Sequence, residues 1–397
     1  MIRQNFNADW TVEKGDGNSR MNSFLGNTQT KTVHLPYDAM IHEARTPDTK
    51  NGAQTGFYPG GEYIFQKHFT APQAWQGKPV SLVFEGVYQT ALVYLNGWLL
   101  TRNVNGYAEF TVEAGPYLKY GADNLLKVIA DNSLEPNSRW YTGSGIYRPV
   151  RLLVGNKVYL PQDTVRITTR EADEGFALLD VTAQVQSAST VTERVTLQQT
   201  ICREGTAVLT DRQNLLLQPG ESRTVSFRYC VDSPALWSPE NPNLYTSTMQ
   251  VLEGEEELDR EETGFGIRTL SIDAAHGVRI NGQTVKLRGA CIHHDNGILG
   301  AATLPDAEER RIRQLKEAGF NAIRSSHHPA GRALLDACDR YGVLVMDELS
   351  DVWNVRKNPY DYALYFEQDW KPTIQKMVAK DYNHPSVILY CVGNEIS

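Results

Sequence analysis

The chain has 397 residues, 41% of them hydrophobic and 22% charged, and a formal net charge of −8. This length is too great for one ordinary core and predicts two or three globular domains, while the acidic balance argues against nucleic acid or an anionic membrane as a partner. From the sequence we expect no signal peptide, and there is no apolar run long enough to span a membrane. The five cysteines are an odd count without C-x-x-C spacing, so they indicate neither a disulfide framework nor a zinc site. Free thiols of this kind favour a cytoplasmic protein.

Residues 1 to about 160 have the pattern of a β-sandwich. Short runs rich in β-branched and aromatic residues are separated by Gly, Asn and Pro, as at 63–69, 81–84, 91–95 and 125–130. The Asn96-Gly97 pair that follows one of these runs predicts a type I′ hairpin. Most of the aromatic side chains in this part are expected in the core of the sandwich.

Residues 161–270 continue in strands but are more polar. Alternating runs occur at 164–169, 178–185, 195–200 and 225–230. Their spacing predicts an immunoglobulin-like sandwich, although the Cys–Trp–Cys pattern of antibody domains is not evident. Trp237 is expected to anchor an edge of this domain, and the nearby prolines to keep that edge from pairing.

Residues 271–397 change to alternating strands and helices. Strands are predicted at 285–289, 321–324, 343–348 and 387–392, and helices after Asp306, at 332–341 and at 370–381. Asp306 and Glu309 are expected to form a capping box, and Pro372 to lie in the first turn of its helix. A full (β/α)8 barrel takes about 250 residues, so this part predicts the N-terminal half of such a barrel and a truncated chain. The predicted fold class is therefore multidomain β plus α/β.

Polar residues follow all four predicted strands of the last region. They lie at 291–295, 325–329, 347–351 and 394–395. A single His beside an apolar strand is more often structural than functional. Four clusters at the same ends of parallel strands are harder to explain by folding alone, because the chemistry of barrels is placed on that rim. We therefore expect a functional site there.

The last stretch, residues 383–395, resembles the acid/base signature of glycoside hydrolase family 2, which includes β-galactosidases, β-glucuronidases and β-mannosidases. Residues 85–87, 94–97 and 143–148 resemble sequence motifs of that family's jelly-roll sugar-binding domain. The resemblance implies that Glu395 is the general acid/base and that Asn394 holds the sugar 2-hydroxyl. As the acid, Glu395 is expected to have a raised pKa.

The same resemblance implies further site residues. His293 and His327 are expected to contact sugar hydroxyls or to support the transition state. Asp347 and Arg324 are expected either to contact the sugar or to form a supporting network. Arg139 and Trp140 lie in the loop that reaches toward the barrel pocket in the family, and they are expected to bind substrate.

A retaining glycosidase needs a second carboxylate about 5–5.5 Å from the acid/base. In the family this nucleophile follows the seventh strand, so it is expected to be absent from a sequence that ends on the fourth. No cofactor and no required metal are expected. Some family β-galactosidases bind magnesium through a Glu whose position here holds Val352, and adjacent His293 and His294 would point to opposite faces of a strand.

The sequence therefore predicts the N-terminal portion of a retaining exo-β-glycosidase, a homo-oligomer that hydrolyses terminal β-D-galactosides or β-D-glucuronides of an oligosaccharide or glycoside. The alternative is a carbohydrate-binding or assembly module without catalysis. The sugar stays open, because Arg139 or Arg324 could pair with a glucuronate carboxylate or could be structural. The domain limits are expected at 1–160, 161–270 and 271–397.

Overall fold

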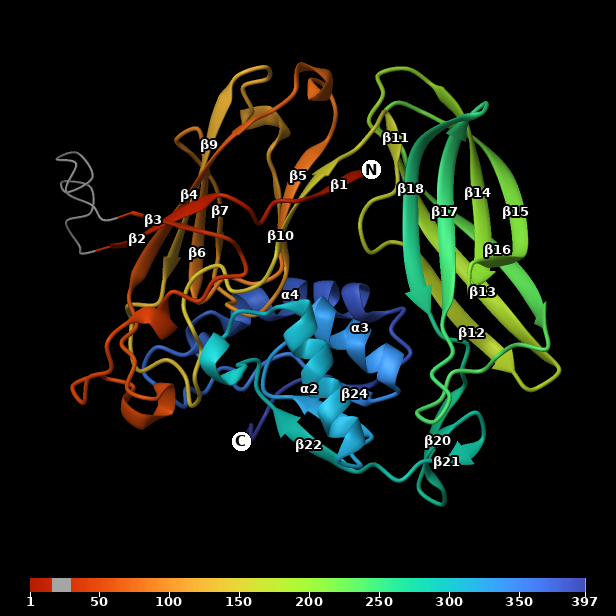
Figure 1. Ribbon diagram of the computed structural model, residues 1–397. Helices are drawn as coiled ribbons and strands as arrows, with labels where there is room; N and C mark the ends of the chain where they lie inside the picture. Colours follow the sequence, from red (N-terminus) through yellow and green to blue (C-terminus); the bar gives the residue numbers. More distant parts are fainter. Residues whose placement is uncertain (16–29, 397) are drawn as a thin grey trace.

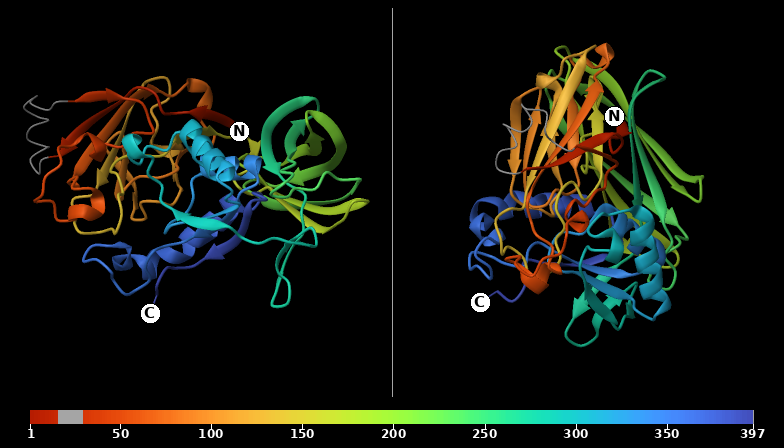
Figure 2. Two further views of the ribbon diagram at one scale, coloured as in Figure 1. Left: turned by 60° about the horizontal axis from the view of Figure 1, so that its bottom comes forward. Right: turned by 60° about the vertical axis from the view of Figure 1, so that its left-hand side comes forward.

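The computed structural model describes residues 1–15 and 30–396, and Figure 1 shows two β-sandwiches that both rest on an α/β layer. The two views of Figure 2 show the same arrangement, with the α/β part in contact with each sandwich. The multidomain β plus α/β class predicted from the sequence is confirmed. Among the described residues, no helix is long and apolar enough to cross a bilayer.

The first sandwich packs a sheet of strand order β1-β10-β5-β8 against one of order β3-β2-β4-β9-β6-β7. The facing sides bury Trp10, Phe65 and Phe84 completely. At the turn between β6 and β7, Asn96 and Gly97 have φ of 53° and 90°, as the predicted type I′ hairpin requires. The strands are β1 (Ile2–Asn5), β2 (Trp10–Gly15), β3 (Lys31–Val33), β4 (Glu62–Thr70), β5 (Val80–Phe84), β6 (Thr90–Leu95), β7 (Trp98–Asn103), β8 (Phe110–Glu113), β9 (Asp123–Asp131) and β10 (Val150–Val154).

The second sandwich is built from long antiparallel strands in which buried and partly exposed residues alternate, as the sequence predicts. One sheet has β13 between β12 and β16, with β11 also on β13, and the other has the order β15-β14-β17-β18. The strands are β11 (Val158–Tyr159), β12 (Arg166–Ala172), β13 (Phe176–Ser187), β14 (Glu193–Arg203), β15 (Thr206–Leu217), β16 (Ser222–Asp232), β17 (Tyr245–Glu253) and β18 (Glu256–Phe265), and the short strands β19 (Leu270–Asp273), β20 (Gly277–Ile280) and β21 (Gln283–Thr284) follow.

The α/β part has a parallel sheet of order β22-β23-β24-β25, so the C-terminal ends of all four strands lie on one edge. Helices α2 and α3 pack on one another beside this sheet. The elements are β22 (Gly289–Ile292), α2 (Pro305–Glu317), β23 (Ala322–Ser325), α3 (Arg332–Tyr341), β24 (Leu344–Glu348), α4 (Phe366–Asp381) and β25 (Val387–Cys391). Short 3-10 helices η1 (Met40–His42), η2 (Gly52–Thr55), η3 (Gln73–Trp75), η4 (Gly115–Tyr117), η5 (Gly297–Leu299) and η6 (Tyr362–Leu364) lie in the connections.

Three boundary predictions in this part are wrong. Strand β22 begins four residues after the predicted start, because the N–H of Val285 still bonds to Val278 in the preceding hairpin. Helix α2 has Leu304 at its N-cap and no side-chain cap, since Pro305 takes the first helical position and Asp306 falls inside the first turn. Helix α4 begins at Phe366, so Pro372 lies inside the helix.

Trp237 anchors the second sandwich to the α/β part, as a structural residue. Its side chain is fully buried in a cluster with Ile280, Leu344 and Ile388. The indole Nε1 donates to the main-chain oxygen of Asp339 at 3.0 Å. The parallel sheet is therefore held at the ends opposite to those that carry the polar clusters.

Candidate active site at the carboxyl edge of the parallel sheet

The predicted site residues converge on the C-terminal edge of the parallel sheet from two domains. His293 follows β22, His327 follows β23, and Asn394 and Glu395 follow β25. The sandwich loop between β9 and β10 crosses to the same edge, where Arg139 contacts Glu395. Asp347 differs from the other predicted site residues, because its carboxylate accepts from main-chain N–H groups instead of contacting those residues.

Trp140 and two histidines form a wall of aromatic rings. The indole stacks on the imidazole of His293, with ring centroids 4.9 Å apart and an interplanar angle of 14°. Its edge contacts His327 at 5.7 Å. The indole Nε1 donates to Tyr107 Oη at 3.1 Å, which fixes the ring. The Nδ1 of His293 donates to the carbonyl of Ser326 at 2.8 Å, because the carbonyl oxygen can only accept, and this bond orients the ring.

A cavity of about 40 Å³ lies beside this wall, between sandwich loops and the loop after β24. Its volume admits only a few water molecules, so a ligand with a six-membered ring would not fit inside and could lie only at its mouth. Aromatic faces, side-chain amides and carboxylates share its lining, which includes Tyr88, Asn105, Asn137, Trp140, His327, Asp351 and Asp361. Such a mixture suits a ligand with an apolar face and several hydroxyl groups.

Asp351 is the centre of a charged network at the edge. Its carboxylate accepts from Arg139 Nη2 at 2.6 Å and Nε at 3.1 Å, a bidentate pair between two domains. It also accepts from Lys357 Nζ at 3.0 Å and from Asn394 Nδ2 at 2.9 Å. Burial alone would raise the pKa of Asp351, but these donors lower it. Asp351 is therefore an anion that holds cations and the Asn394 amide in fixed positions.

Glu395 lies at the open side of this network, with 66% of its side chain exposed. Arg139 Nη1 donates to its Oε2 at 3.0 Å, and Lys357 Nζ lies 3.6 Å from the same oxygen. The hydrogen bond from Arg139 and the two positive charges lower the pKa of Glu395. The raised pKa expected for an acid is therefore wrong for this arrangement, because the carboxyl is solvated and faces cations instead of an apolar wall. Its φ of 46° places Glu395 in the left-handed region.

Asp347 and Glu348 at the end of β24 have no exposed surface. Asp347 Oδ1 accepts from the N–H groups of Ala330 and Glu348, and burial raises the pKa of its carboxyl. Glu348 accepts from Arg324 Nε at 2.6 Å and lies 3.1 Å from His327 Nδ1. Of the two roles that the sequence left open for Asp347, this placement favours a supporting one.

Lys357, which no sequence pattern indicated, contacts both halves of the Asn394–Glu395 pair. It lies in an irregular segment with no motif and no regular apolar pattern. The only local signal is Asp361, whose Oδ2 accepts from the N–H groups of Lys357 and Asn358, both at 2.7 Å. Such a turn is readable from the sequence, but the target of the lysine is not.

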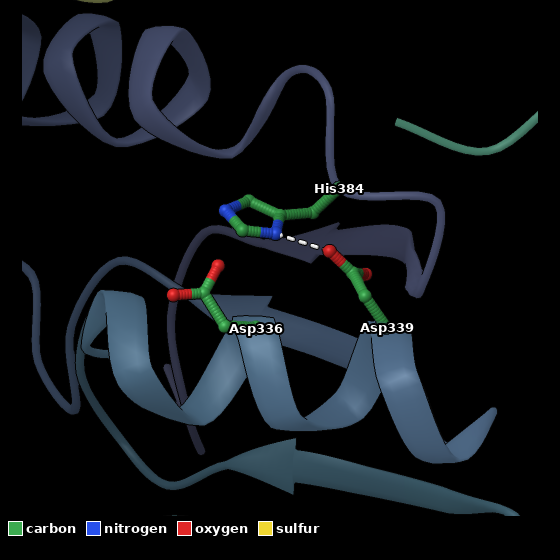
Figure 3. Close-up of side chains that lie close together, drawn as sticks. All are labelled: Asp336, Asp339 and His384. Atoms are coloured by element: carbon green, nitrogen blue, oxygen red, sulfur yellow. Dashed lines mark hydrogen bonds and ion pairs between the residues drawn. The ribbon is translucent and has the colours of Figure 1, made fainter. Parts of the chain in front are cut away.

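Asp336, Asp339 and His384 bring three possible metal-ligating atoms close together, as Figure 3 shows. They lie on α3 and just before β25, away from the edge that carries Glu395. Burial opposes protonation of His384, but Asp339, 2.6 Å from its Nδ1, raises its pKa. The contact with Asp339 already uses Nδ1 of His384, and Asp339 Oδ1 accepts from the N–H of Ser386 at 3.0 Å. These contacts tie α3 to the segment just before β25.

Three family profiles match the chain. The description "Glycosyl hydrolase 2 galactose-binding domain-like" covers residues 10–176, "Glycosyl hydrolases family 2" covers 158–268, and "Glycosyl hydrolases family 2, TIM barrel domain" covers 274–397. Together these profiles of one family cover nearly the whole sequence.

Curated and solved relatives show the same likeness. A β-galactosidase of Bacteroides ovatus is 37% identical over 99% of this chain and 46% of its own length. A putative β-glucuronidase of Formosa agariphila is 32% identical over 99% of this chain and 37% of its own length. The crystal structure of a glycosyl hydrolase family 2 member from Bacteroides cellulosilyticus has a TM-score of 0.95 at 37% identity, over all of this chain and 52% of the other. The chain thus spans about half the length of these relatives.

Proposed function

Because the chain belongs to glycoside hydrolase family 2, we propose that it provides the acid/base side of the active site of a retaining exo-β-glycosidase that acts on terminal β-D-galactosides or β-D-glucuronides. The observation that carries the proposal is the Asn394–Glu395 pair at the C-terminal end of β25, on the edge where the sandwich loop brings Arg139 and Trp140. Catalytic groups of (β/α)8 enzymes occupy this end of the strands.

In this proposal Glu395 protonates the glycosidic oxygen as the aglycone leaves, and the resulting carboxylate then takes a proton from the water that releases the sugar. Asn394 is held for sugar binding by Asp351 on its amide nitrogen and by Arg324 Nη2, 3.3 Å from its oxygen. Trp140, His293 and His327 provide the wall against which the sugar ring lies. Asp351 does not serve as the nucleophile in this proposal, because three side chains donate hydrogen bonds to its carboxylate. The nucleophilic carboxylate therefore comes from a residue outside this group.

The test is Glu395→Gln in a protein that spans the length of the relatives. General acid assistance is worth about 10²–10⁴-fold. We expect a loss of that size on a disaccharide, whose leaving group needs a proton, and a much smaller loss on an activated aryl glycoside. Glu367→Gln, an exposed carboxyl on α4, is the control and leaves both rates unchanged.

Equal losses on both substrates would contradict the acid role of Glu395. Unchanged hydrolysis of both would support the alternative that this part of the chain binds carbohydrate without catalysis.

The guanidinium groups near the site favour the galactoside over the glucuronide. Arg139 is occupied by Asp351 and Glu395, and Arg324 by Glu348. A glucuronate carboxylate, which prefers a bidentate partner, would have to compete with these carboxylates for the guanidinium groups. Rates on nitrophenyl β-galactoside and β-glucuronide, measured side by side, decide the sugar, and a faster glucuronide would contradict this preference.

We also propose domain limits at residues 1–160, 161–270 and 271–397, a cytoplasmic location and a homo-oligomeric state. The free cysteines among the described residues support a reducing compartment. The exposed Trp98 and Leu99 on the β6–β7 hairpin support self-association. Limited proteolysis, fractionation of cells and sedimentation test the three points separately.

A further inference from the structure

The segment that carries Asn394 and Glu395 is tied to the loop after β24 by one ammonium group. Lys357 Nζ donates to the main-chain oxygen of Asn394 at 2.7 Å, to the main-chain oxygen of Asp351 at 2.9 Å and to Asp351 Oδ1 at 3.0 Å. These three acceptors use all three of its protons. We propose that Lys357 is a positioning residue that fixes the Asn394–Glu395 pair and keeps a positive charge beside Glu395. The proposal rests on the acid/base role of Glu395.

Lys357 is itself held in place by the turn in which it lies. Asp361 is 4% exposed, and its carboxylate accepts from the main-chain N–H groups of Lys357, Asn358 and Ala363 at 2.7, 2.7 and 3.1 Å. The N–H of Tyr360 donates to the carbonyl of Pro136 in the first sandwich at 3.2 Å. The turn that presents the ammonium is thus fixed from two domains, and only 19% of the lysine side chain is exposed.

The charges around Glu395 show what Lys357 contributes. Arg139 and Lys357 bring two positive charges, and Asp351 balances one of them. Ionised Glu395 balances the other, so the group of four side chains is neutral only when Glu395 has lost its proton. The lowered pKa of Glu395 agrees with this balance. Without a sugar the site therefore rests with Glu395 in the form that acts as a base.

Arg139 and Lys357 contribute to this balance in different ways. Arg139 makes a hydrogen bond to Glu395, and a leaving-group oxygen that receives the proton would have to displace it. Lys357 has no hydrogen bond to Glu395 at 3.6 Å, and its own protons stay with Asn394 and Asp351. Its charge therefore persists through both half-reactions, where it opposes protonation of Glu395 and favours its return to the base form.

The test is a carbon-13 NMR titration of the Glu side-chain carboxyls in a protein that spans the length of the relatives, with the signal of Glu395 identified by its loss in Glu395→Gln. Lys357→Met removes charge and donors, Lys357→Gln keeps donors without charge, and Lys357→Arg keeps the charge. We expect the pKa of Glu395 to rise in the Met and Gln variants and to stay near the wild-type value in the Arg variant. Lys371→Met, an exposed lysine on α4, is the matched control and leaves the titration unchanged.

A titration of Glu395 that is the same in wild type, Lys357→Met and Lys357→Gln would overturn the proposal. If the Met variant fails to fold, the comparison of the Gln and Arg variants still decides it. This experiment needs no turnover, so its failure is distinguishable from failure of the proposed activity, which the Glu395→Gln rates test.

A second readout uses a protein of the relatives' length that hydrolyses a glycoside. The alkaline limb of kcat/KM reports loss of the proton from the general acid. We expect Lys357→Gln to move this limb to higher pH and Lys357→Arg to leave it in place. A purely structural lysine would lower kcat/KM at all pH values without moving the limb, and that outcome would contradict the role proposed here.

Discussion

Two arginines join the first sandwich to the α/β part, and they do so in opposite directions. Arg332 reaches from α3 to Glu109, with Nε and Nη2 both 2.8 Å from its oxygens, and to Asp163 at 2.6 Å. Arg139 reaches from the sandwich to Asp351 and Glu395. Each pairs bidentately with one carboxylate and singly with another. Glu109 has 11% of its side chain exposed, whereas Glu395 has 66%.

The Arg332 and Arg139 contacts differ in how far solvent reaches the carboxylate that each arginine pairs with. Burial alone would raise the pKa of Glu109, but Arg332 overrides it and lowers the pKa to about 2. That carboxylate stays ionised at any physiological pH and cannot exchange a proton with a ligand. Glu395 has the same kind of partner but is open to solvent, so a bound molecule can change its surroundings. The comparison indicates that the Arg332 contact serves stability, whereas the Arg139 contact leaves Glu395 open for the role proposed above.

The largest expected effect is from Arg332→Met. The variant leaves Glu109 paired with Arg151 at 3.2 Å but removes its bidentate partner and the pair with Asp163, so we expect a loss toward the lower end of the about 3–5 kcal/mol that breaking a buried ion pair typically costs. Urea unfolding followed by tryptophan fluorescence measures the loss. The control is Arg340→Met on the same helix as Arg332, which removes an exposed pair with Glu309 of α2 and costs at most about 1 kcal/mol. Equal losses in the two variants would contradict a stabilising role for the Arg332 contact.

His294 makes a third contact between the same domains, in which its imidazole is uncharged. The stability that this contact contributes therefore depends on pH in a different way from that of the charged pairs. Burial lowers the pKa of His294 to about 3, with Arg148, His293 and Arg311 adding to the effect, and its Nε2 donates to the carbonyl of Thr142. Since the imidazole titrates near 6.5 in the unfolded chain, the contribution of His294 to the free energy of unfolding is complete above that pH. It is lost at about 1.4 kcal/mol per pH unit as the pH falls toward 3.

The free energy of unfolding at pH 7 and pH 5 tests this sign. His294→Gln should unfold with a weaker pH dependence between these values, where Glu109 remains ionised. An unchanged slope in the variant would show that His294 does not stay neutral in the folded protein.

The smallest expected effect on stability is from Arg139→Met. Its pairs are partly solvated, so we expect a change below about 1 kcal/mol in the free energy of unfolding. The same substitution should raise the pKa of Glu395 in the NMR titration, because the hydrogen bond from Arg139 is the largest cause of the lowered pKa and is removed. A loss as large as that of Arg332→Met would erase the difference between the two contacts.

The fold was predictable because it depends on local patterns. Alternation of apolar residues predicted the long strands of the second sandwich, and the apolar run before Asn394 predicted β25. Element boundaries were less predictable where an apolar pattern runs across two elements. Val285 looks like the start of β22 in the sequence, but its N–H bonds to Val278 in the preceding hairpin. Tertiary hydrogen bonds decide such cases, and no local signal reports them.

The site was predictable as a set of strand ends but not as an electrostatic system. Glu395 and Asn394 stand together in the sequence, and the parallel order places them beside the loops after β22, β23 and β24. The state of Glu395 depends on Arg139, which is 256 residues away, and on Lys357 in an irregular loop. Neither neighbour could be assigned from spacing, so the direction of the pKa shift was predicted wrongly.

The backbone at Glu395 has a consequence for how this region can evolve. A side chain other than Gly, Asn or Asp pays about 1–2 kcal/mol to adopt a left-handed conformation such as its φ of 46°. Selection for thermostability alone would therefore drift toward Gly or Asn at position 395 and away from a carboxylate long enough to reach a leaving group. On the acid/base role proposed for Glu395, libraries screened only for stability would enrich inactive variants at this position.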